Sequence, residues 1–355
     1  MGVLIPRPNY PPYGADNGDA GRAEADKLLA ECERRVYLAY EEAAVEMKRK
    51  ANEYLKDFVK EDNRRRKLVE DGEMDADDYK RWRLSHIAQG RRWFQFAAVL
   101  AADLANTNEY AAGIINGYMP DVFAIGANYG LYQGELSGGI DTSFTLYDRE
   151  TVMRLIGEEP ELLPIEAKLN RAESMQWDTK QLASTMTQAI MQGERIENIA
   201  ERLVATVAGM DEKTAIRNAR TAFTSAENGG RYNSYRRLSG AGVNLTIEWC
   251  ATLDGRTRHT HRLLDGIRRR VDQPFEVDGQ KILYAGDPNA PQGLVWNCRC
   301  TMLCFVEGFE VSRTLKESTR PDNMSYRDWK GTKVKEYEKQ KSASKNKPNP
   351  DNPAY

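Results

Sequence analysis

Apolar residues recur every three or four positions from Arg22 to Val69, and no proline or glycine interrupts this stretch. That period matches one face of an α-helix, so the pattern predicts a long amphipathic helix. A second helical region is expected from Asp75 to Leu104. Shorter helices are expected to follow as far as Gly130, with breaks at Gly117 and Pro120, because both residue types disfavour a helix interior. The core side of the second region is predicted to comprise Trp82, Ile87, Trp93, Phe96 and Leu100.

The pattern changes after Gly130. Residues 134–147 combine glycines with alternating apolar and polar positions, which predicts a loop with a short strand. Asp148 is expected to cap a brief helix that ends near Gly157, and Pro160 and Pro164 mark a linker. Three further helices are predicted, each followed by a glycine that serves as a C-terminal stop. These helices are Thr179–Gln192, before Gly193, Ile196–Val207, before Gly209, and Glu212–Leu238, before Gly240.

Residues Val243–Trp249 alternate as a strand does, and short strands and turns are expected from there to Val306. The predicted fold class is therefore α+β, with a mostly helical N-terminal region followed by a smaller C-terminal module of helices and short antiparallel strands. We expect a flexible arm (1–21), a helical domain (22–174), an α+β module (175–310) and a C-terminal trailer with a disordered tail (311–355). Residues 330–355, rich in Lys, Asn and Pro, are expected to be solvated.

Composition narrows the class of protein. The chain has 355 residues, of which 41% are hydrophobic and 29% charged, and its formal net charge is −2. This balance is typical of a globular protein and excludes a uniformly basic nucleic-acid binder. No apolar run reaches the roughly 18–20 residues that cross a bilayer, so we expect no membrane partner. The N-terminus lacks the pattern of a secretory signal, and five unevenly placed cysteines favour a reducing compartment over a disulfide framework.

One window concentrates the residue types that bind metals. Four of the five cysteines and two of the three histidines lie between Trp249 and Cys304. Thiolate and imidazole are the ligands that Zn²⁺ prefers, although the close cysteine pair here is C-x-C and not the usual C-x₂₋₄-C. The alternative is a set of small, reduced, unliganded cysteines in a β-rich core. The predicted ligands are Cys250, His261, Cys298 and Cys300, for which His259 and Cys304 are possible substitutes.

Two other kinds of chemistry are conceivable in the same window. A nucleophilic site could combine a cysteine with His259 or His261 and with Asp254 or Asp265, although no spacing demands it. The arginines suit phosphate contact, hence DNA, but they equally suit a solvated face paired with acidic neighbours or an acidic partner protein. The arginines concerned are Arg256, Arg258, Arg262, Arg268, Arg269 and Arg270.

Several of these segments together resemble the Mu F-like head morphogenesis proteins, which are minor capsid components of tailed bacteriophages. The resemblance covers about residues 175–330. It rests on four groups of residues: Arg220-Thr221 with Ala226 and Asn228; Gly242 with Trp249; Asp254-Gly255-Arg256-Thr257-Arg258 with His261 and Leu264-Asp265-Gly266; and Asn297-Cys298-Arg299-Cys300-Thr301. The stretch from Trp177 to Leu203 and the Met324-Ser325-Tyr326 segment with Trp329 also fit the family.

The resemblance implies a virion protein of low copy number at the portal vertex or the capsid interior, present in the host cytoplasm during assembly. Its implied partners are portal and capsid proteins and packaged DNA. Many members carry C-x-x-C where this chain has Arg258-x-x-His261, and often a glutamate where Ala222 follows the Arg-Thr pair. The predicted metal ligands are then interpreted as a cluster that stabilises the module from within. The chain is interpreted as a structural protein and not as an enzyme. The alternative is a nuclease or ADP-ribosyltransferase that uses His259, His261 and the arginines.

Overall fold

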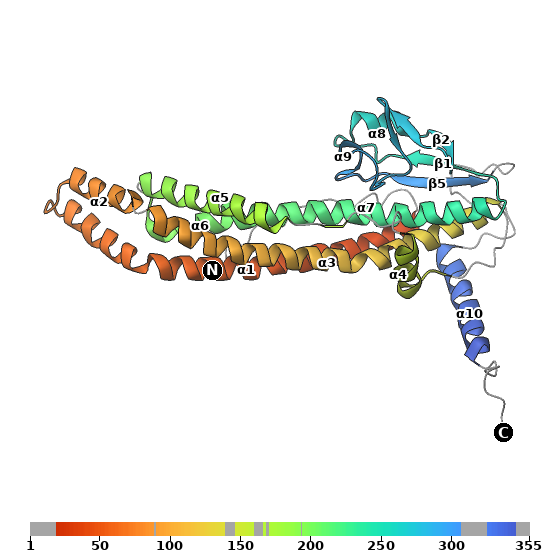
Figure 1. The fold of residues 1–355 in the computed structure, drawn as a ribbon, viewed down its shortest axis with the longest axis horizontal. Coiled ribbons are helices and arrows are strands. Elements are labelled where there is room, and N and C mark those ends of the chain that lie inside the picture. Colours follow the sequence, from red (N-terminus) through yellow and green to blue (C-terminus); the bar gives the residue numbers. More distant parts are fainter. Residues whose placement is uncertain are drawn as a thin grey trace, which may run out of the picture. The chain divides into compact units, whose positions relative to one another are not determined.

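The computed structural model describes residues 19–88, 90–138, 146–159, 166–167, 170–192, 194–306 and 325–345 (Figure 1). Nearly all of the predicted arm lies outside these ranges, as do the linker prolines Pro160 and Pro164 and residues 139–145 of the predicted loop and strand. No helix of the described part is both long and apolar enough to cross a membrane.

Three elements fill the first part of the described chain: α1 (Ala20–Glu70), α2 (Ala76–Ala88) and α3 (Gly90–Gly138). The long helix predicted from Arg22 is confirmed by α1. The breaks predicted at Gly117 and Pro120 are wrong, because α3 continues through both. Met119, Val122 and Phe123 are buried around the proline, so tertiary packing outweighs the hydrogen bond that Pro120 removes. The same helix occupies residues 134–138, where a loop was expected.

The next helices are α4 (Arg149–Glu158), α5 (Arg171–Met191), α6 (Ile196–Leu203) and α7 (Gly209–Gly240). Asp148 caps α4 as predicted, and its carboxylate accepts a hydrogen bond from the N–H of Thr151. The stop predicted at Gly209 is wrong, because a π-helical turn, η2 (Val204–Ala208), leads directly into α7. The end of α7 at Gly240 agrees with the sequence.

The C-terminal module contains short antiparallel strands, which confirms the predicted α+β class. Strands β1 (Leu245–Cys250), β2 (Arg268–Arg270) and β5 (Thr301–Val306) form one sheet in the order β2-β1-β5. Strands β3 (Phe275–Val277) and β4 (Gln280–Ile282) form a hairpin. Two short helices lie between the strands in sequence, α8 (His259–Leu264) and α9 (Gln292–Val295).

Residues 330–345 are not an extended tail but belong to a helix, α10 (Tyr326–Lys345). The expectation of a solvated tail at residues 330–355 followed their composition, whereas the helix begins before them, at Tyr326. Tyr326 and Trp329 are buried, the indole Nε1 of Trp329 donates to the Glu135 carboxylate, and Lys333 pairs with that carboxylate at 3.3 Å. Residues 346–355 lie outside the described part.

The chain divides into two compact units that alternate along the sequence. Unit 1 comprises residues 1–30, 118–165 and 220–355, and unit 2 comprises residues 31–117 and 166–219. The predicted domains follow one another in sequence instead. Helices α1, α3 and α7 each contribute one part to unit 1 and another to unit 2.

In unit 1, α3 and α7 approach so closely that their backbones touch. A Cβ atom added to Gly126 would lie 1.9 Å from the carbonyl oxygen of Glu227, and one added to Gly230 would lie 2.1 Å from that of Phe123. Ser234 adds a hydrogen bond of 2.7 Å from its hydroxyl to the carbonyl of Ala127. Glycine is therefore required at both positions for this packing distance.

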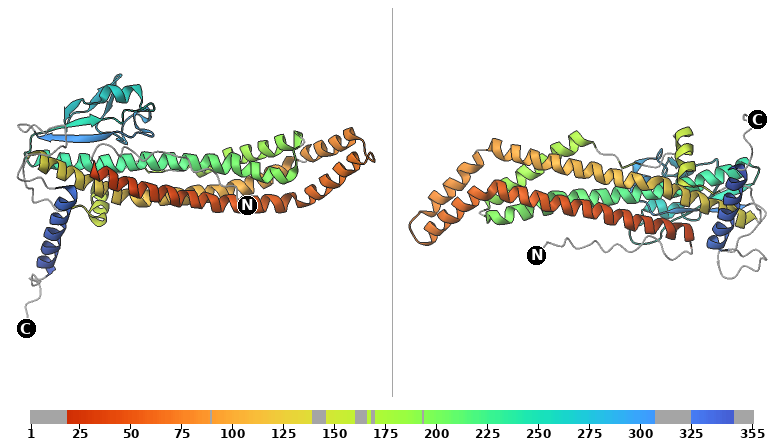
Figure 2. Two further views of the ribbon diagram at one scale, coloured as in Figure 1. Left: turned by 180° about the vertical axis from the view of Figure 1, so that it is seen from behind. Right: turned by 90° about the horizontal axis from the view of Figure 1, so that it is seen from below.

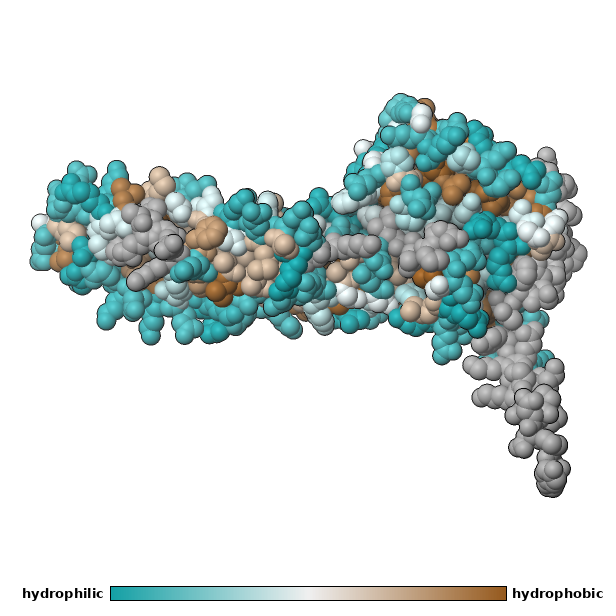
Figure 3. All heavy atoms as spheres, in the orientation of Figure 1, coloured by the Kyte–Doolittle hydropathy of each residue, from teal (hydrophilic) through white to brown (hydrophobic). Residues whose placement is uncertain are grey.

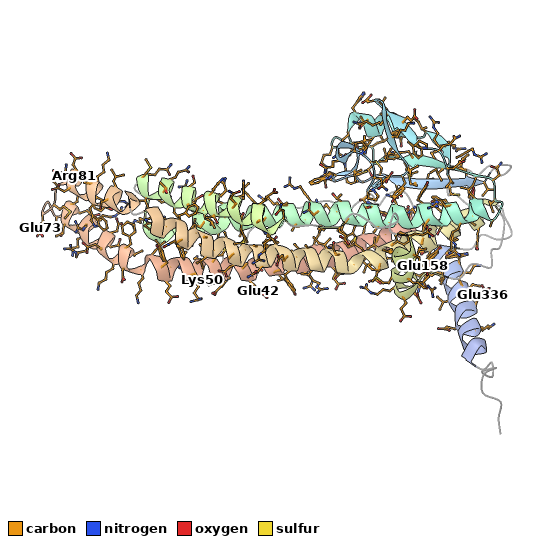
Figure 4. The ribbon with its side chains drawn as sticks, viewed as in Figure 1. Glu42, Lys50, Glu73, Arg81, Glu158 and Glu336 are labelled. Atoms are coloured by element: carbon orange, nitrogen blue, oxygen red, sulfur yellow. The ribbon has the colours of Figure 1, made fainter. Side chains whose placement is uncertain are left out.

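Unit 2 is a bundle of helices, and α1 and α3 run side by side in both views of Figure 2. Its core includes Leu55, Leu100 and Leu182, which are almost completely buried. Charged side chains, Glu42 and Lys50 among them, follow the outer side of α1 in Figure 4. On the face drawn in Figure 3, hydrophilic residues predominate, with apolar residues between them on the strand-bearing module.

Candidate metal centre

The buried side of α7 holds the backbone around the two closely spaced cysteines. Thr224 donates its hydroxyl proton to the carbonyl of Cys298 at 2.9 Å, and the Asn228 amide donates to the carbonyl of Cys300 at 3.0 Å. The Thr221 hydroxyl accepts from the N–H of Asn297 at 2.9 Å. These three side chains are spaced three or four residues apart, so they share one face of the helix. Strand β5 and the loop before it therefore lie along α7, as Figure 1 shows.

Three of the four predicted ligands meet at this place. His261 on α8 and Cys298 and Cys300 after α9 are each 2% exposed, and their ligand atoms lie within 4.8 Å of one another. His261 Nδ1 is 3.6 Å from Cys298 Sγ and 3.3 Å from Cys300 Sγ. Zinc bonds of about 2.3 Å to sulfur and 2.0–2.1 Å to nitrogen in a tetrahedron would separate these atoms by about 3.5 Å. The donor set and its spacing therefore fit Zn²⁺.

Aromatic rings close one side of this cluster. The Trp249 indole stands edge-on to the His261 ring at 5.5 Å and to Phe275 at the same distance. The second imidazole nitrogen, Nε2, is buried and has no hydrogen-bond partner among the described residues. The nitrogen that faces the sulfurs is thus the only one with polar contacts, and the outer hydrogen bond that usually orients a zinc-bound histidine is absent from the described contacts.

The two thiols differ in their readiness to ionise. The hydrogen bond with the Cys300 thiol lowers the pKa of Cys298 despite its burial, and the Cys300 N–H assists with a contact of 3.4 Å to the Cys298 sulfur. The pKa of Cys300 is raised by that same hydrogen bond and by burial. Cys298 is therefore the preferred thiolate of the pair, which is the form that binds a metal.

The remaining predicted ligands lie apart from this group. Cys250 is half-buried at the end of β1, and it does not belong to the set of mutually close ligand atoms in the described chain. Burial raises its pKa to about 11 and that of Cys304, on β5, to about 12. His259 is exposed at the start of α8. The structure thus assembles three protein ligands where the sequence analysis expected four.

An ion pair that the sequence analysis missed links the two segments of the window. Arg299, between the two cysteines, contacts both carboxylate oxygens of Asp254 at 2.5 Å. The Thr252 hydroxyl donates to the carbonyl of Arg299 at 2.9 Å. The hydrogen bonds from Arg299 hold the pKa of Asp254 well below its usual range. The opposite charges of the Asp-Gly-Arg-Thr and Asn-Cys-Arg-Cys segments were the signal in the sequence for this ion pair. The spacing of the two segments did not show that Asp254 and Arg299 are partners.

Comparison with known proteins bears on the same residues. Residues 180–303 match the family described as Phage Mu protein F like protein. The chain is also 27% identical over 223 residues to the minor head protein GP7 of Bacillus phage SPP1, covering 60% of this chain and 67% of that protein. These two matches confirm the resemblance of residues 180–303 to the Mu F-like phage head proteins.

A second relative carries a different name. The chain is 29% identical over 234 residues to the NAD(+)--arginine ADP-ribosyltransferase EFV of Enterococcus faecalis. The aligned segment covers 62% of this chain but only 44% of that protein. No solved structure matches the chain.

The Mu F-like match contains the whole metal centre and the Asp254–Arg299 ion pair. Arg258 stands where many members of the family have a cysteine, and its guanidinium donates to the carbonyl of Trp296 instead. That carbonyl lies two residues before Cys298, so Arg258 supports the ligand loop by a hydrogen bond and not by a metal bond.

The other arginines of the Mu F-like module also have partners within the chain. Arg262 donates to the carbonyl of Asp254 at 2.8 Å, and Arg268 pairs with Glu248 at 2.7 Å. The contacts of the remaining three are Arg256 with Asp254 at 3.7 Å, Arg269 with the carbonyl of Arg268 at 2.9 Å, and Arg270 with Asp272 at 3.4 Å. The ion pairs of Arg256 and Arg270 are exposed and therefore weak, so these two guanidinium groups can exchange them for other anions.

The nucleophilic arrangement is not assembled by the described contacts. Asp254 is bound by Arg299, and Asp265 accepts a hydrogen bond of 2.8 Å from the N–H of Ala251. Neither carboxylate contacts His259 or His261 among the described hydrogen bonds. A base oriented by a carboxylate, which a triad requires, is therefore missing from this part of the Mu F-like module.

Proposed function

We propose that the chain is a minor head protein of a tailed bacteriophage that sits in the virion, bound to the portal or to the inside of the capsid. The similarity to the SPP1 minor head protein supports this function. The observation that carries the proposal is the burial of the centre. Three ligands, each 2% exposed, are held by α7 and flanked by an ion pair between the signature segments. Burial of these three side chains suits a centre that stabilises the module.

Mass spectrometry of purified particles tests the location. Particles of the phage that encodes the chain should contain its peptides in far lower amount than those of the major capsid protein. Particles assembled with a Cys298→Ser/Cys300→Ser variant should contain less of it, because the module is destabilised. Finding the chain only in the lysate, and never in DNA-filled particles, would contradict the proposal.

Zinc is the metal proposed for the centre. His261, Cys298 and Cys300 would hold it, and a water or a further group would complete the tetrahedron. Elemental analysis of the purified protein should give about one zinc per chain, and His261→Ala should remove it. The control His259→Ala changes an exposed histidine of the same helix and should keep the metal. A folded wild-type protein without metal would leave the two thiols as simple core residues.

DNA is the proposed partner of the arginines on β2. These side chains lie on an edge strand of the sheet, and contacts with phosphates would make the affinity depend on salt. Fluorescence anisotropy with duplex DNA should show binding that weakens steeply from 50 to 200 mM salt, with a shallower slope for Arg269→Ala/Arg270→Ala. Lys281→Ala, an exposed control on β4, should change the slope less. An affinity that does not change with salt would argue for a protein partner at this strand.

An enzyme remains the second candidate, because one relative is named an arginine ADP-ribosyltransferase. The proposed catalytic residues are His259, His261 and the arginines. Incubation with labelled NAD⁺ and an arginine-rich acceptor distinguishes the two functions. Label transfer that His259→Ala abolishes, in a variant that remains folded, would favour the enzyme.

A further inference from the structure

A cavity of about 130 Å³ with both polar and apolar lining residues lies among the helices of unit 2 and shares no residue with the candidate metal centre. None of the described residues that line it is basic. Its polar lining consists of Tyr40, Asn108, Ser174, Asp211, Thr214 and Asn218.

A chain of hydrogen bonds runs along the cavity wall. The Tyr40 hydroxyl donates to Asn108 Oδ1 at 2.5 Å, and the Asn108 amide nitrogen donates to Asp211 at 2.7 Å and to the Ser174 hydroxyl at 3.3 Å. That hydroxyl donates to Asp178 Oδ2 at 3.3 Å. These hydrogen bonds join α1, α3, α5 and α7, and they end on the carboxylates of Asp211 and Asp178.

No positively charged side chain of the described structure pairs with these two carboxylates. Asp178 is 0% exposed, and its Oδ1 has no hydrogen-bond partner in the described structure. Burial, followed by repulsion from Asp211, raises the pKa of Asp178 to about 7, and burial also raises the pKa of Asp211. Neither residue forms an ion pair with a described residue. Buried carboxylates are costly unless a proton neutralises them or a positive charge compensates them, so a bound cation would stabilise this network at pH 8.

The local backbone is also unusual. The π-helical turn η2 ends at Ala208, directly before α7, and Asp211 lies in the first turn of α7. Single π-helical turns occur frequently at functional sites. This feature is independent of the charges and marks the same place.

We propose that the cavity binds one hard divalent cation, Mg²⁺ or Ca²⁺, with the Asp211 carboxylate as direct ligand. Asp178 supplies the second negative charge through Ser174. Carboxylate, hydroxyl and amide oxygens are the donors that these cations select. A volume of about 130 Å³ has room for the ion with several of its waters, each of which occupies about 30 Å³ in the liquid.

Thermal unfolding of the full chain at pH 8, at fixed zinc and ionic strength, tests the proposal. Adding MgCl₂ or CaCl₂ should raise the unfolding midpoint by about 3 °C or more and then saturate, because the ion binds only the folded state. Comparison of the two salts identifies the preferred ion. Asp178→Asn and Asp211→Asn should lose this response, yet their metal-free midpoints should equal or exceed that of the wild type because a buried charge is gone. Asp57→Asn, an exposed control on α1, should respond as the wild type does.

Two results would overturn the proposal. A midpoint that neither salt changes at pH 8, but that rises as the pH falls to 6, means that a proton compensates the carboxylates. A cation response that both variants retain means that the ion binds elsewhere. Neither result bears on the virion location proposed above.

Discussion

At the scale of single residues, polar side chains on the buried face of α7 decide how the ligand loop is held. Thr224 and Asn228 each satisfy a cysteine carbonyl that would otherwise be buried without a donor. The Asn228 side-chain oxygen also accepts from the Thr301 hydroxyl at 3.2 Å. Asn228, which is 0% exposed, thus bridges the end of the ligand loop and the start of β5.

Asn228→Ala should lower the free energy of unfolding by about 1–3 kcal/mol, because it leaves the Cys300 carbonyl buried and unsatisfied. Denaturant unfolding measures this loss. Asn198→Ala removes an exposed amide on α6 and should change stability by less than about 0.5 kcal/mol. A loss below about 0.5 kcal/mol in Asn228→Ala as well would show that the hydrogen bond to the Cys300 carbonyl contributes little.

At the scale of elements, the close contact of α3 and α7 depends on residues without side chains. Gly126 lies against the α7 backbone, whereas Gly113, in the same helix, has no atom near its Cβ position. The same substitution should therefore have opposite effects at the two positions.

Gly126→Ala should destabilise the protein by about 1–3 kcal/mol, because the new methyl group forces the helices apart. Gly113→Ala should stabilise it by about 0.5–1 kcal/mol through helix propensity alone. Thermal unfolding of the two variants side by side is the measurement. A stabilising Gly126→Ala would mean that α3 and α7 are not in backbone contact at this point.

The elements also show what sequence patterns can predict. The helical period located α1, and the N-cap located α4, because both signals are local. Pro120 misled the prediction because buried neighbours on α3 outweigh one missing hydrogen bond. The helix α10 was not predicted, because Glu135, the partner of Trp329 at its start, lies almost two hundred residues earlier in the sequence. At the candidate metal centre, three of the four predicted ligands lie close together, whereas Cys250, on β1, lies apart from them.

At the scale of the whole molecule, segments distant in sequence are joined by a buried charge network in unit 1. Arg231, 0% exposed on α7, pairs with Asp19 and Glu227 at 2.7 Å each and lies over the Tyr129 ring at 4.6 Å. Arg22 on α1 also contacts the Glu227 carboxylate. The network thus fixes the beginning of α1 to the middle of α7.

Arg231→Leu should cost about 3–5 kcal/mol, because Asp19 loses its ion-pair partner and the buried Glu227 keeps only Arg22. Arg236→Leu is the matched control on the same helix, since Arg236 is 46% exposed and its contact with Glu159 is 3.9 Å long. Its effect should stay within about 0.5 kcal/mol. Hydrogen exchange should also show faster opening at the start of α1 in Arg231→Leu alone.

This network has a consequence for synthesis on the ribosome. Arg22 is made 205 residues before its partner Glu227, which at about 5–20 residues per second corresponds to roughly 10–40 s. During that interval the charged and apolar side chains of the first turns of α1 have no α7 to pack against. Strand β1 is likewise synthesised before its partner β5, and Glu135 is synthesised before Trp329. Unit 1 therefore acquires its native contacts late and nearly together, and a nascent chain halted before residue 300 would expose its unfinished surfaces to chaperones and proteases.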